Sequence, residues 1–382
     1  MNEDLKQICE TYFGIIEDVR CEVNIKYKLT DILIIVMCGV LCGLDEIEKI
    51  KEYADLKEAM FKEKFGIERI PSETTIARVL AAIDVEKLGI AILGILTRNV
   101  TKREGQISID GKTIRSTETM QKYGTSLQIL TAYLTDCGVC LEQIGIYEKT
   151  NEIPVARDIL DLLDVKGKVV TLDAMHCQKD TVKKIIENQG DYIIGLKKNQ
   201  HQLYKDIDEM YRDLLNSSYK EDKNIYDEYE VIEKNRGRIE TRRIYNFKDM
   251  SWLDQKRDWT GMKTIFAIER TIEEKDKTSV ELSYYITSLG NDLKDLLERT
   301  REHWKIESMH WLLDMTYSED TNRTANEMAQ KNLNVLRKLG LSVHKQYLKN
   351  INEKKPNIRK NMFKCMLNDE LLFEVISNIT SL

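Results

Sequence analysis

The chain has 382 residues, 42% of them hydrophobic, so it is long enough to form two or three domains with sizeable cores. It has 64 acidic residues against 58 Lys plus Arg, and the net charge of −6 excludes a uniformly basic nucleic-acid-binding protein. Any contact with DNA must therefore come from local basic patches.

The first hundred residues are predicted to be helical. Their acidic start lacks a charged and apolar leader, which predicts a cytoplasmic protein. The most apolar run, residues 32–44, is shorter than the roughly 20 residues that span a bilayer, so it indicates a buried helix. Residues 45–65 predict one charged amphipathic helix, and Ser72 can cap another. We expect residues 1–100 to form a helical domain for DNA-end binding or dimerisation, and the pattern favours neither role.

The pattern then changes to that of an α/β fold. Three strands are predicted first, at residues 107–110, 126–134 and 139–147. Alternating helices and strands follow, at residues 151–163, 168–173, 178–189 and 192–196. Two strands that are joined by a short helix form a parallel βαβ unit. The three strands before it are of the antiparallel type. This order predicts a ribonuclease-H-like mixed sheet with flanking helices.

The remaining residues predict an insertion, a long helix and a tail. A polar helix is followed by a β-rich insertion at about residues 216–289, before the last catalytic helix. That long helix runs over residues 292–315, capped by Asn291 or Asp292. The expected catalytic domain and basic C-terminal tail occupy residues 101–345 and 346–382.

Two of the predicted strands end in an aspartate, Asp110 and Asp173. A ribonuclease-H-like order places these strands side by side, so both carboxylates meet at one edge of the sheet. Mg²⁺ prefers such ligands, and two ions can stabilise the attacking and leaving oxygens of a phosphodiester. The site needs a third carboxylate, for which Glu307 and Asp314 on the long helix are candidates. Glu307 and His310 also have the spacing of a di-iron motif, but such sites need two pairs on different helices.

Six stretches of the chain together carry a family pattern. They lie at residues 70–75, 109–115, 172–178, 190–200, 237–242 and 303–320. In this order they resemble the DDE-type insertion-sequence transposases of the H-repeat-associated group. The resemblance implies a ribonuclease-H-like core in which Asp110, Asp173 and Glu307 bind two Mg²⁺ ions, with Mn²⁺ as a substitute.

The resemblance also implies an activity and partners. The implied activity is cleavage and strand transfer of transposon-end DNA. The implied partners are double-stranded terminal inverted repeats and target DNA on the nucleoid, bound by a homodimer in synapsis, with no membrane.

The pattern departs from that of related transposases around the last acid. Those proteins have a Tyr and an Arg before the acid and a Lys after it, and here the three positions hold Thr300, His303 and Asp314. Arg301 and Lys305 can replace the two cations. Glu307 and Asp314 therefore both remain candidates for the third carboxylate.

Cations and amides near the acids are candidate DNA contacts. They are Lys112, Arg115, Lys197, Lys198, Asn199, Gln200, Arg301 and Lys305, with Arg236, Arg238, Arg242 and Arg243 in the insertion. Arg suits bidentate contact with phosphate. The same residues can also be explained without DNA: Lys112 and Arg115 by a solvated loop, residues 197–200 by a strand-to-helix connector, and the insertion arginines by a hairpin with exposed charges. Two other functions are compatible with this sequence: a nuclease without strand transfer, and a catalytically silent DNA-binding relic.

Overall fold

The computed structural model describes residues 5–21, 23, 25–97, 105–114, 127–135, 138–146, 152–216, 225–235, 237–275, 277–317 and 326–377. The chain divides into two compact units. Unit 1 consists of Met1–Lys102, Lys112–Glu148 and Ser308–Leu382, and unit 2 consists of Arg103–Gly111 and Lys149–Glu307. Among the helices in the described ranges, none is both long and apolar enough to cross a membrane.

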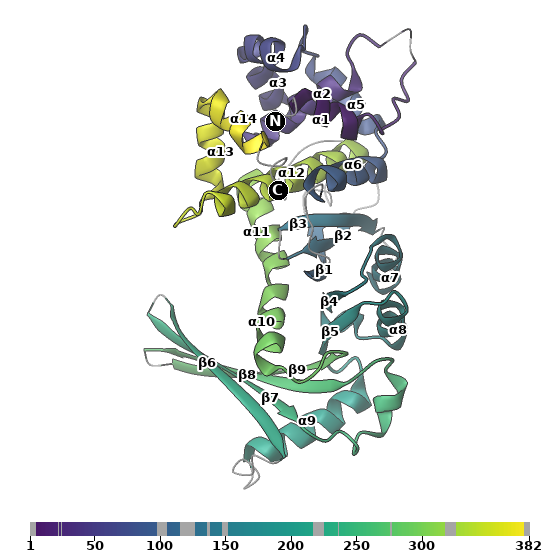
Figure 1. The fold of residues 1–382 in the computed structure, drawn as a ribbon, viewed down its shortest axis with the longest axis vertical. Helices are drawn as coiled ribbons and strands as arrows, with labels where there is room; N and C mark the ends of the chain where they lie inside the picture. The colour runs from purple at the N-terminus through teal and green to yellow at the C-terminus, as the bar shows by residue number, and fades with distance from the viewer. Residues whose placement is uncertain are drawn as a thin grey trace. The chain divides into compact units, whose positions relative to one another are not determined.

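Unit 1 is built mainly from helices. Those before the first strand are α1 (Leu5–Phe13), α2 (Leu29–Leu41), α3 (Ile47–Leu56), α4 (Glu58–Phe65), α5 (Glu73–Ala82) and α6 (Val85–Thr97). After the strands, unit 1 contains α11 (Lys305–Tyr317) from Ser308 onward, α12 (Glu327–Asn350), α13 (Ile358–Leu367) and α14 (Asp369–Ser377). The long helix α12 packs against α2, α5 and α6 and is buried along most of its length, so it forms the centre of this unit (Figure 1).

The strands that the described residues form follow one another in the order β3-β2-β1-β4-β5-β9-β8-β7-β6. Their bounds are β1 (Gly105–Ile114), β2 (Leu127–Leu134), β3 (Val139–Ile146), β4 (Lys168–Leu172), β5 (Asp191–Leu196), β6 (Tyr226–Asn235), β7 (Arg238–Phe247), β8 (Thr264–Glu274) and β9 (Lys277–Thr287). β2 and β3 are antiparallel, β1, β4 and β5 are parallel, and β9 returns antiparallel to β5. This is the expected ribonuclease-H-like mixed sheet, and the predicted fold is confirmed.

Helices cover both faces of the parallel strands in unit 2. α7 (Glu152–Leu162) and α8 (Lys179–Glu187) lie side by side on one face, and α10 (Leu293–His303) lies on the other (Figure 1). Successive residues of β4 are therefore buried on both faces, as a strand between two helical layers requires.

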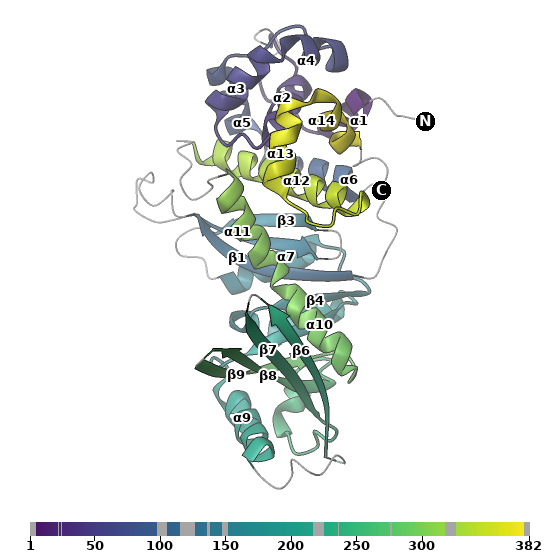
Figure 2. The ribbon, with the colours of Figure 1, turned by 90° about the vertical axis from the view of Figure 1, so that its left-hand side faces the viewer.

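The predicted insertion extends the sheet with four antiparallel strands, visible as the long β6–β7 and β8–β9 hairpins (Figure 2). These strands lie between α10 and α9 (His201–Asn216). On the α10 side, Leu296 belongs to a buried cluster with Ile244 and Phe266. On the α9 side, the hydroxyl of the buried Tyr211 donates to the Tyr245 carbonyl at 2.9 Å. The insertion therefore has a core on each face.

Two predicted helix caps are confirmed. The Ser72 hydroxyl accepts a hydrogen bond from the Thr75 backbone N–H at 3.3 Å. At the start of α10, the Asp292 carboxylate accepts one from the Asp295 N–H at 3.1 Å. Each bond satisfies a backbone donor that the helix itself leaves without a partner.

Two helices predicted as continuous are each broken, and those predictions are wrong. Residues 45–65 divide at Lys57 into α3 and α4. The turn brings the rings of Tyr53 and Phe61 edge to face, with centroids 6.2 Å apart, so it folds two apolar faces together. Residues 292–315 divide at Trp304 into α10 and α11. No glycine or proline marks either break.

Candidate active site

The pairing of β1 with β4 brings the two predicted aspartates together. The strands are parallel, and the last residues paired between them are Ile109 and Leu172. The next residues, Asp110 and Asp173, are therefore neighbours on strands about 4.8 Å apart. Asp110 does not end its own strand as expected, because β1 continues to Ile114, but it stands where the ladder to β4 ends.

A short turn holds the Asp173 carboxylate. Its Oδ1 accepts a hydrogen bond from the Ala174 N–H at 2.5 Å and so caps the 3₁₀ turn that follows β4. Two of the predicted DNA contacts bind this same turn. The Asn199 amide donates to the Ala174 carbonyl at 2.7 Å, and the Gln200 amide donates to the Cys177 carbonyl at 2.8 Å. Both amides therefore contact protein backbone and stabilise the turn beside the acid.

A ladder of buried polar side chains attaches α10 to the strands. The Gln106 amide donates to the Thr171 hydroxyl at 3.3 Å and to a backbone carbonyl of α10 at 2.9 Å. The Thr171 hydroxyl also lies 2.9 Å from the Ser108 hydroxyl and 2.9 Å from Nδ1 of His303. Gln106 and Ser108 lie on the same face of β1 as Asp110, because every second residue of a strand faces the same side. The apolar residues between them face the other side. The ladder thus holds the end of α10, just before Glu307, against that face.

Glu307 lies in the first turn of α11 and belongs to the same compact unit as the two aspartates. Partial burial raises the pKa of its carboxyl, and the charges of Asp110 and Asp173 raise it further. Like charges act in this way at short range, so the three acids share one electrostatic environment. They also line one cavity of about 330 Å³, together with Lys197 and His303.

Glu152, at the start of α7, is an acid in this environment that the sequence pattern does not predict. Burial raises the pKa of its carboxyl, and Asp110 and Asp173 add to the effect. Its Oε2 lies 4.0 Å from Nε2 of the buried His176. A glutamate in the first turn of a helix is common because it complements the helix dipole, so its position alone carries no functional signal.

The predicted lysine contacts differ in their surroundings. Lys197 and Lys198 are exposed, and Nζ of Lys197 lies 3.8 Å from Oδ1 of Asp173. Within unit 1, Lys112 is only partly exposed and donates to Oδ1 of Asp314 at 2.7 Å. Asp314, the other candidate for the third acid, is therefore neutralised by a cation.

The remaining predicted cations that the structure describes form ion pairs with glutamates. Arg115 and Arg236 lie outside the described residues. The pairs are Arg301 with Glu233, Lys305 with Glu302, Arg238 with Glu274, Arg242 with Glu240 and Arg243 with Glu230. DNA phosphate would have to compete with these carboxylates for the same donors.

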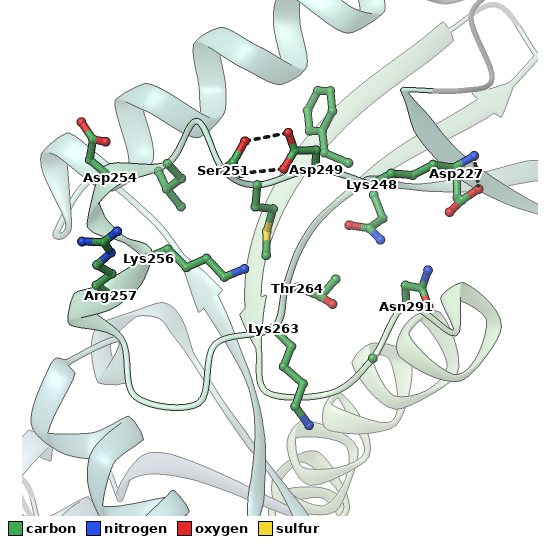
Figure 3. A pocket seen from close by; sticks show the side chains of 15 residues that line it. Asp227, Lys248, Asp249, Ser251, Asp254, Lys256, Arg257, Lys263, Thr264 and Asn291 are labelled. Atoms are coloured by element: carbon green, nitrogen blue, oxygen red, sulfur yellow. Dashed lines mark hydrogen bonds and ion pairs between the residues drawn. The ribbon is translucent and has the colours of Figure 1, made fainter.

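A larger cavity, of about 1080 Å³, lies in the insertion and contains none of the predicted acids. Figure 3 shows Asp227 paired with Lys248, and Asp249 accepting from Ser251 through both of its carboxylate oxygens. These acids already have partners within the protein. Cavity size therefore does not identify the active site, whereas the gathering of acids does.

The strand-end acids suit a hard divalent cation. Mg²⁺ prefers carboxylate oxygens, and a bound cation would relieve the repulsion that raises the pKa of Glu307. Across the described ranges, no three His, Cys, Asp or Glu side chains are close enough to enclose one ion.

Comparison with known proteins identifies the class to which this fold and site belong. Residues 101–341 match the family model described as "Transposase DDE domain", and residues 10–94 match the one described as "DDE_Tnp_1-associated". The chain belongs to the DDE transposase family, and the resemblance predicted from the sequence is confirmed.

Two relatives that match nearly the whole chain are named as transposases. The chain is 31% identical, over 97% of its length and 95% of the relative, to "Putative transposase YncI" of Escherichia coli O157:H7. It is 29% identical, over 98% of both chains, to "H repeat-associated putative transposase YhhI" of Escherichia coli strain K12. Among solved structures, a piggyBac transposase synaptic complex with hairpin DNA aligns with all of this chain and 82% of its own, at 12% identity and a TM-score of 0.44.

Proposed function

We propose that this transposase cuts DNA at the ends of an insertion sequence and joins those ends to target DNA by metal-dependent phosphodiester chemistry. The observation that carries the proposal is the pairing of β1 with β4, which makes Asp110 and Asp173 neighbours. The effect of both aspartates on Glu307 supports Glu307 as the third acid. The pairing of Asp314 with Lys112 argues against Asp314 in that role.

Asp110, Asp173 and Glu307 would hold two Mg²⁺ ions, with Mn²⁺ as a substitute. When bound, the ions supply Lewis-acid stabilisation for the attacking and leaving oxygens of the phosphodiester. The chain's own contribution is to keep the three acids in place. The capped turn holds Asp173, and the Thr171 hydroxyl anchors the helix end that precedes Glu307.

Double-stranded DNA is the proposed partner, both as the terminal inverted repeats and as the target. Lys197 is the best-placed phosphate contact because it is exposed beside Asp173, and the adjoining Lys198 is also exposed. Lys112, Arg301 and Lys305 remain proposed contacts that exchange their present partners for phosphate, and Arg115 remains a proposed contact outside the described residues. Asn199 and Gln200 support the turn.

The division of labour along the chain is also a proposal. Residues 1–100 would bind the DNA ends or form a homodimer interface, since joining two ends requires both to be held together. Residues 101–345 would carry the catalysis, and the basic segment 346–382 would add DNA contacts.

The test is incubation of the purified protein with Mg²⁺ and labelled DNA that carries the element's own ends, using Asp173→Asn as the inactive comparison. We expect cleavage at the ends followed by joined products, both absent from the variant. Cleavage of any DNA without joining would identify a nuclease instead, and binding without cleavage would identify a DNA-binding relic. If Asp173→Asn cuts as fast as the parent, the proposed site is wrong.

A further inference from the structure

Two large apolar side chains are exposed on one face of α11. Met309, Leu313 and Tyr317 recur at helical spacing and are buried, so they form the face that packs against the protein. Trp311 and Met315 lie one turn apart on the opposite face, where they are 61% and 46% exposed. Single exposed apolar residues are common, but neighbouring ones of this size indicate a surface that binds another molecule.

Trp311 and Met315 line a cavity of about 780 Å³. Its other apolar walls come from Leu348 near the end of α12 and from Pro356 and Ile358, where the chain leads into α13. All of these residues belong to unit 1, and none of the three proposed metal ligands is among them. An apolar cavity of this size can enclose a small ligand or one group of a larger molecule.

The turn that follows α12 fixes one wall of this cavity. Asn352 has a φ of 51°, and its N–H donates to the Lys349 carbonyl at 3.1 Å. The Glu353 N–H donates to the Leu348 carbonyl, also at 3.1 Å. This pair of bonds is the Schellman motif, which satisfies the last carbonyls of a helix. Asn357 then caps α13, so the wall is formed by the backbone itself before any ligand binds.

The border of the cavity is cationic. Its charged lining residues are Lys345, Lys349 and Arg359 against one acid, Glu353. The surrounding residues 345–364 contain seven Lys or Arg and only that acid. Exposed cations in this segment that form no ion pair with any acid the structure describes are Lys354, Lys355, Arg359, Lys360 and Lys364. An apolar cavity with such a border complements a ligand that joins a flat apolar group to negative charges.

We propose that this cavity binds an unpaired base of single-stranded DNA. The indole of Trp311 stacks on the base, and the surrounding cations contact the adjoining phosphates. A base within a duplex is stacked on both faces and offers no free face to the indole, so the site selects single strands. This inference rests on DNA as the partner of the transposase and is independent of the metal site. The competing occupant is an acidic segment of another protein, which would not make Trp311 important for DNA binding.

The experiment measures binding of fluorescently labelled DNA to the full-length protein by anisotropy, without divalent metal so that no cleavage occurs. The probes are a single strand of about 10 thymidines, within the usual site size of such proteins, and a blunt duplex. We expect Trp311→Ala to weaken single-strand binding about 10-fold and to leave duplex binding unchanged. Trp311→Phe keeps a ring and should lose less. The matched control is Phe363→Ala, an exposed aromatic residue of α13 outside the cavity, which should bind like the parent.

The salt dependence of single-strand binding tests the phosphate contacts. Each phosphate contact on a single strand contributes about 0.7 to the slope of log affinity against log salt concentration. Arg359→Gln should therefore reduce that slope by about 0.7. An unchanged slope would mean that Arg359 does not contact phosphate.

Several results would overturn the inference. One is parental single-strand affinity in Trp311→Ala, and another is an equal loss for single strand and duplex. Should Trp311→Ala fail to fold, Trp311→Leu keeps an apolar side chain without the ring, and parental affinity in that variant has the same meaning. Cleavage of the element's ends is measured separately with Mg²⁺. A protein that binds single strands through Trp311 but cuts no DNA would sustain this inference while the proposed function fails.

Discussion

Unit 2 contains two groups of acidic side chains in opposite surroundings. In the insertion, Glu240 is 5% exposed and pairs with Arg242 and Arg270. Burial alone would raise the pKa of Glu240, but the hydrogen bond from Arg270 and the charges of both arginines outweigh burial and lower it. In the second group, around Asp110 and Asp173, burial raises the pKa of Glu307 and of Glu152, and the charges of the two aspartates raise it further.

The difference shows where this protein tolerates repulsion between its own charges. Guanidinium groups neutralise the carboxylates of the insertion, which serve to hold four strands together. Among the side chains that the structure describes, no Lys or Arg forms an ion pair with Glu307, and its pKa is raised by burial and by the two aspartates. Acids left in mutual repulsion and lining a cavity are typical of a functional site rather than of a structural one. The predictions below test this contrast.

Substitution of a strand-end aspartate should have the largest effect. Asp110→Asn or Asp173→Asn removes a metal ligand, so we expect DNA-end cleavage to slow at least about 10³-fold, the loss of several kcal/mol of transition-state stabilisation. The free energy of unfolding without metal should not fall, because a repulsive charge is removed. Single-turnover cleavage and urea unfolding measure the two quantities, with Asp158→Asn, which changes an exposed acid of α7, as the control. A marked loss of stability in both variants would mean that these acids are structural.

Glu240→Gln should show the reverse behaviour. It leaves Arg242 and Arg270 without their shared carboxylate, and because both guanidiniums keep some contact with water we expect a loss of about 2 kcal/mol, below the range for fully buried pairs. Urea unfolding measures this loss, and Glu307→Gln is the matched substitution at the other group. An equal loss in both variants would remove the distinction between the two groups of acids.

The two groups also differ in how far the sequence could predict them. Asp110 and Asp173 follow from chain order, because a ribonuclease-H-like strand order places their two strands side by side and each aspartate follows an apolar run. Glu307 is harder to place, since no glycine or proline marks the break at Trp304. That break accompanies tertiary contacts, such as the bond between His303 and Thr171, which no local pattern encodes.

Glu152 could not be predicted from its own surroundings in the sequence. Its location depends on three segments that meet only in the folded unit: the start of α7, Gly111 in β1, and His176 after β4. The ion pairs of Arg238, Arg242 and Arg243 in the insertion could not be predicted for a similar reason. Their glutamate partners lie on the same or neighbouring strands, and the pairing is visible only once the strand register is known.

Removal of the Thr171 hydroxyl should have a moderate effect on stability. Thr171→Val keeps the shape but leaves Ser108 and His303 without a shared partner in a buried position, which we expect to cost about 1–2 kcal/mol. Cleavage should also slow, because the end of α10 before Glu307 loses its anchor. Thr171→Ser keeps the hydroxyl and serves as the control. Parental stability and cleavage in Thr171→Val would mean that the ladder does not position Glu307.

The smallest expected effect is the pH dependence of the Glu240 pairing. The pKa of Glu240 is lowered from the ordinary value of 4.5, so its stabilisation is fully present above that value and is lost as the pH falls through the lower, folded-state pKa. The difference in unfolding free energy between the parent and Glu240→Gln should therefore be constant near neutral pH and shrink toward pH about 3. Urea unfolding of both proteins across this range measures the difference. A difference that stays constant or grows with acidification would contradict the pairing, because protonation of Glu240 must remove the charge that Arg242 and Arg270 bind.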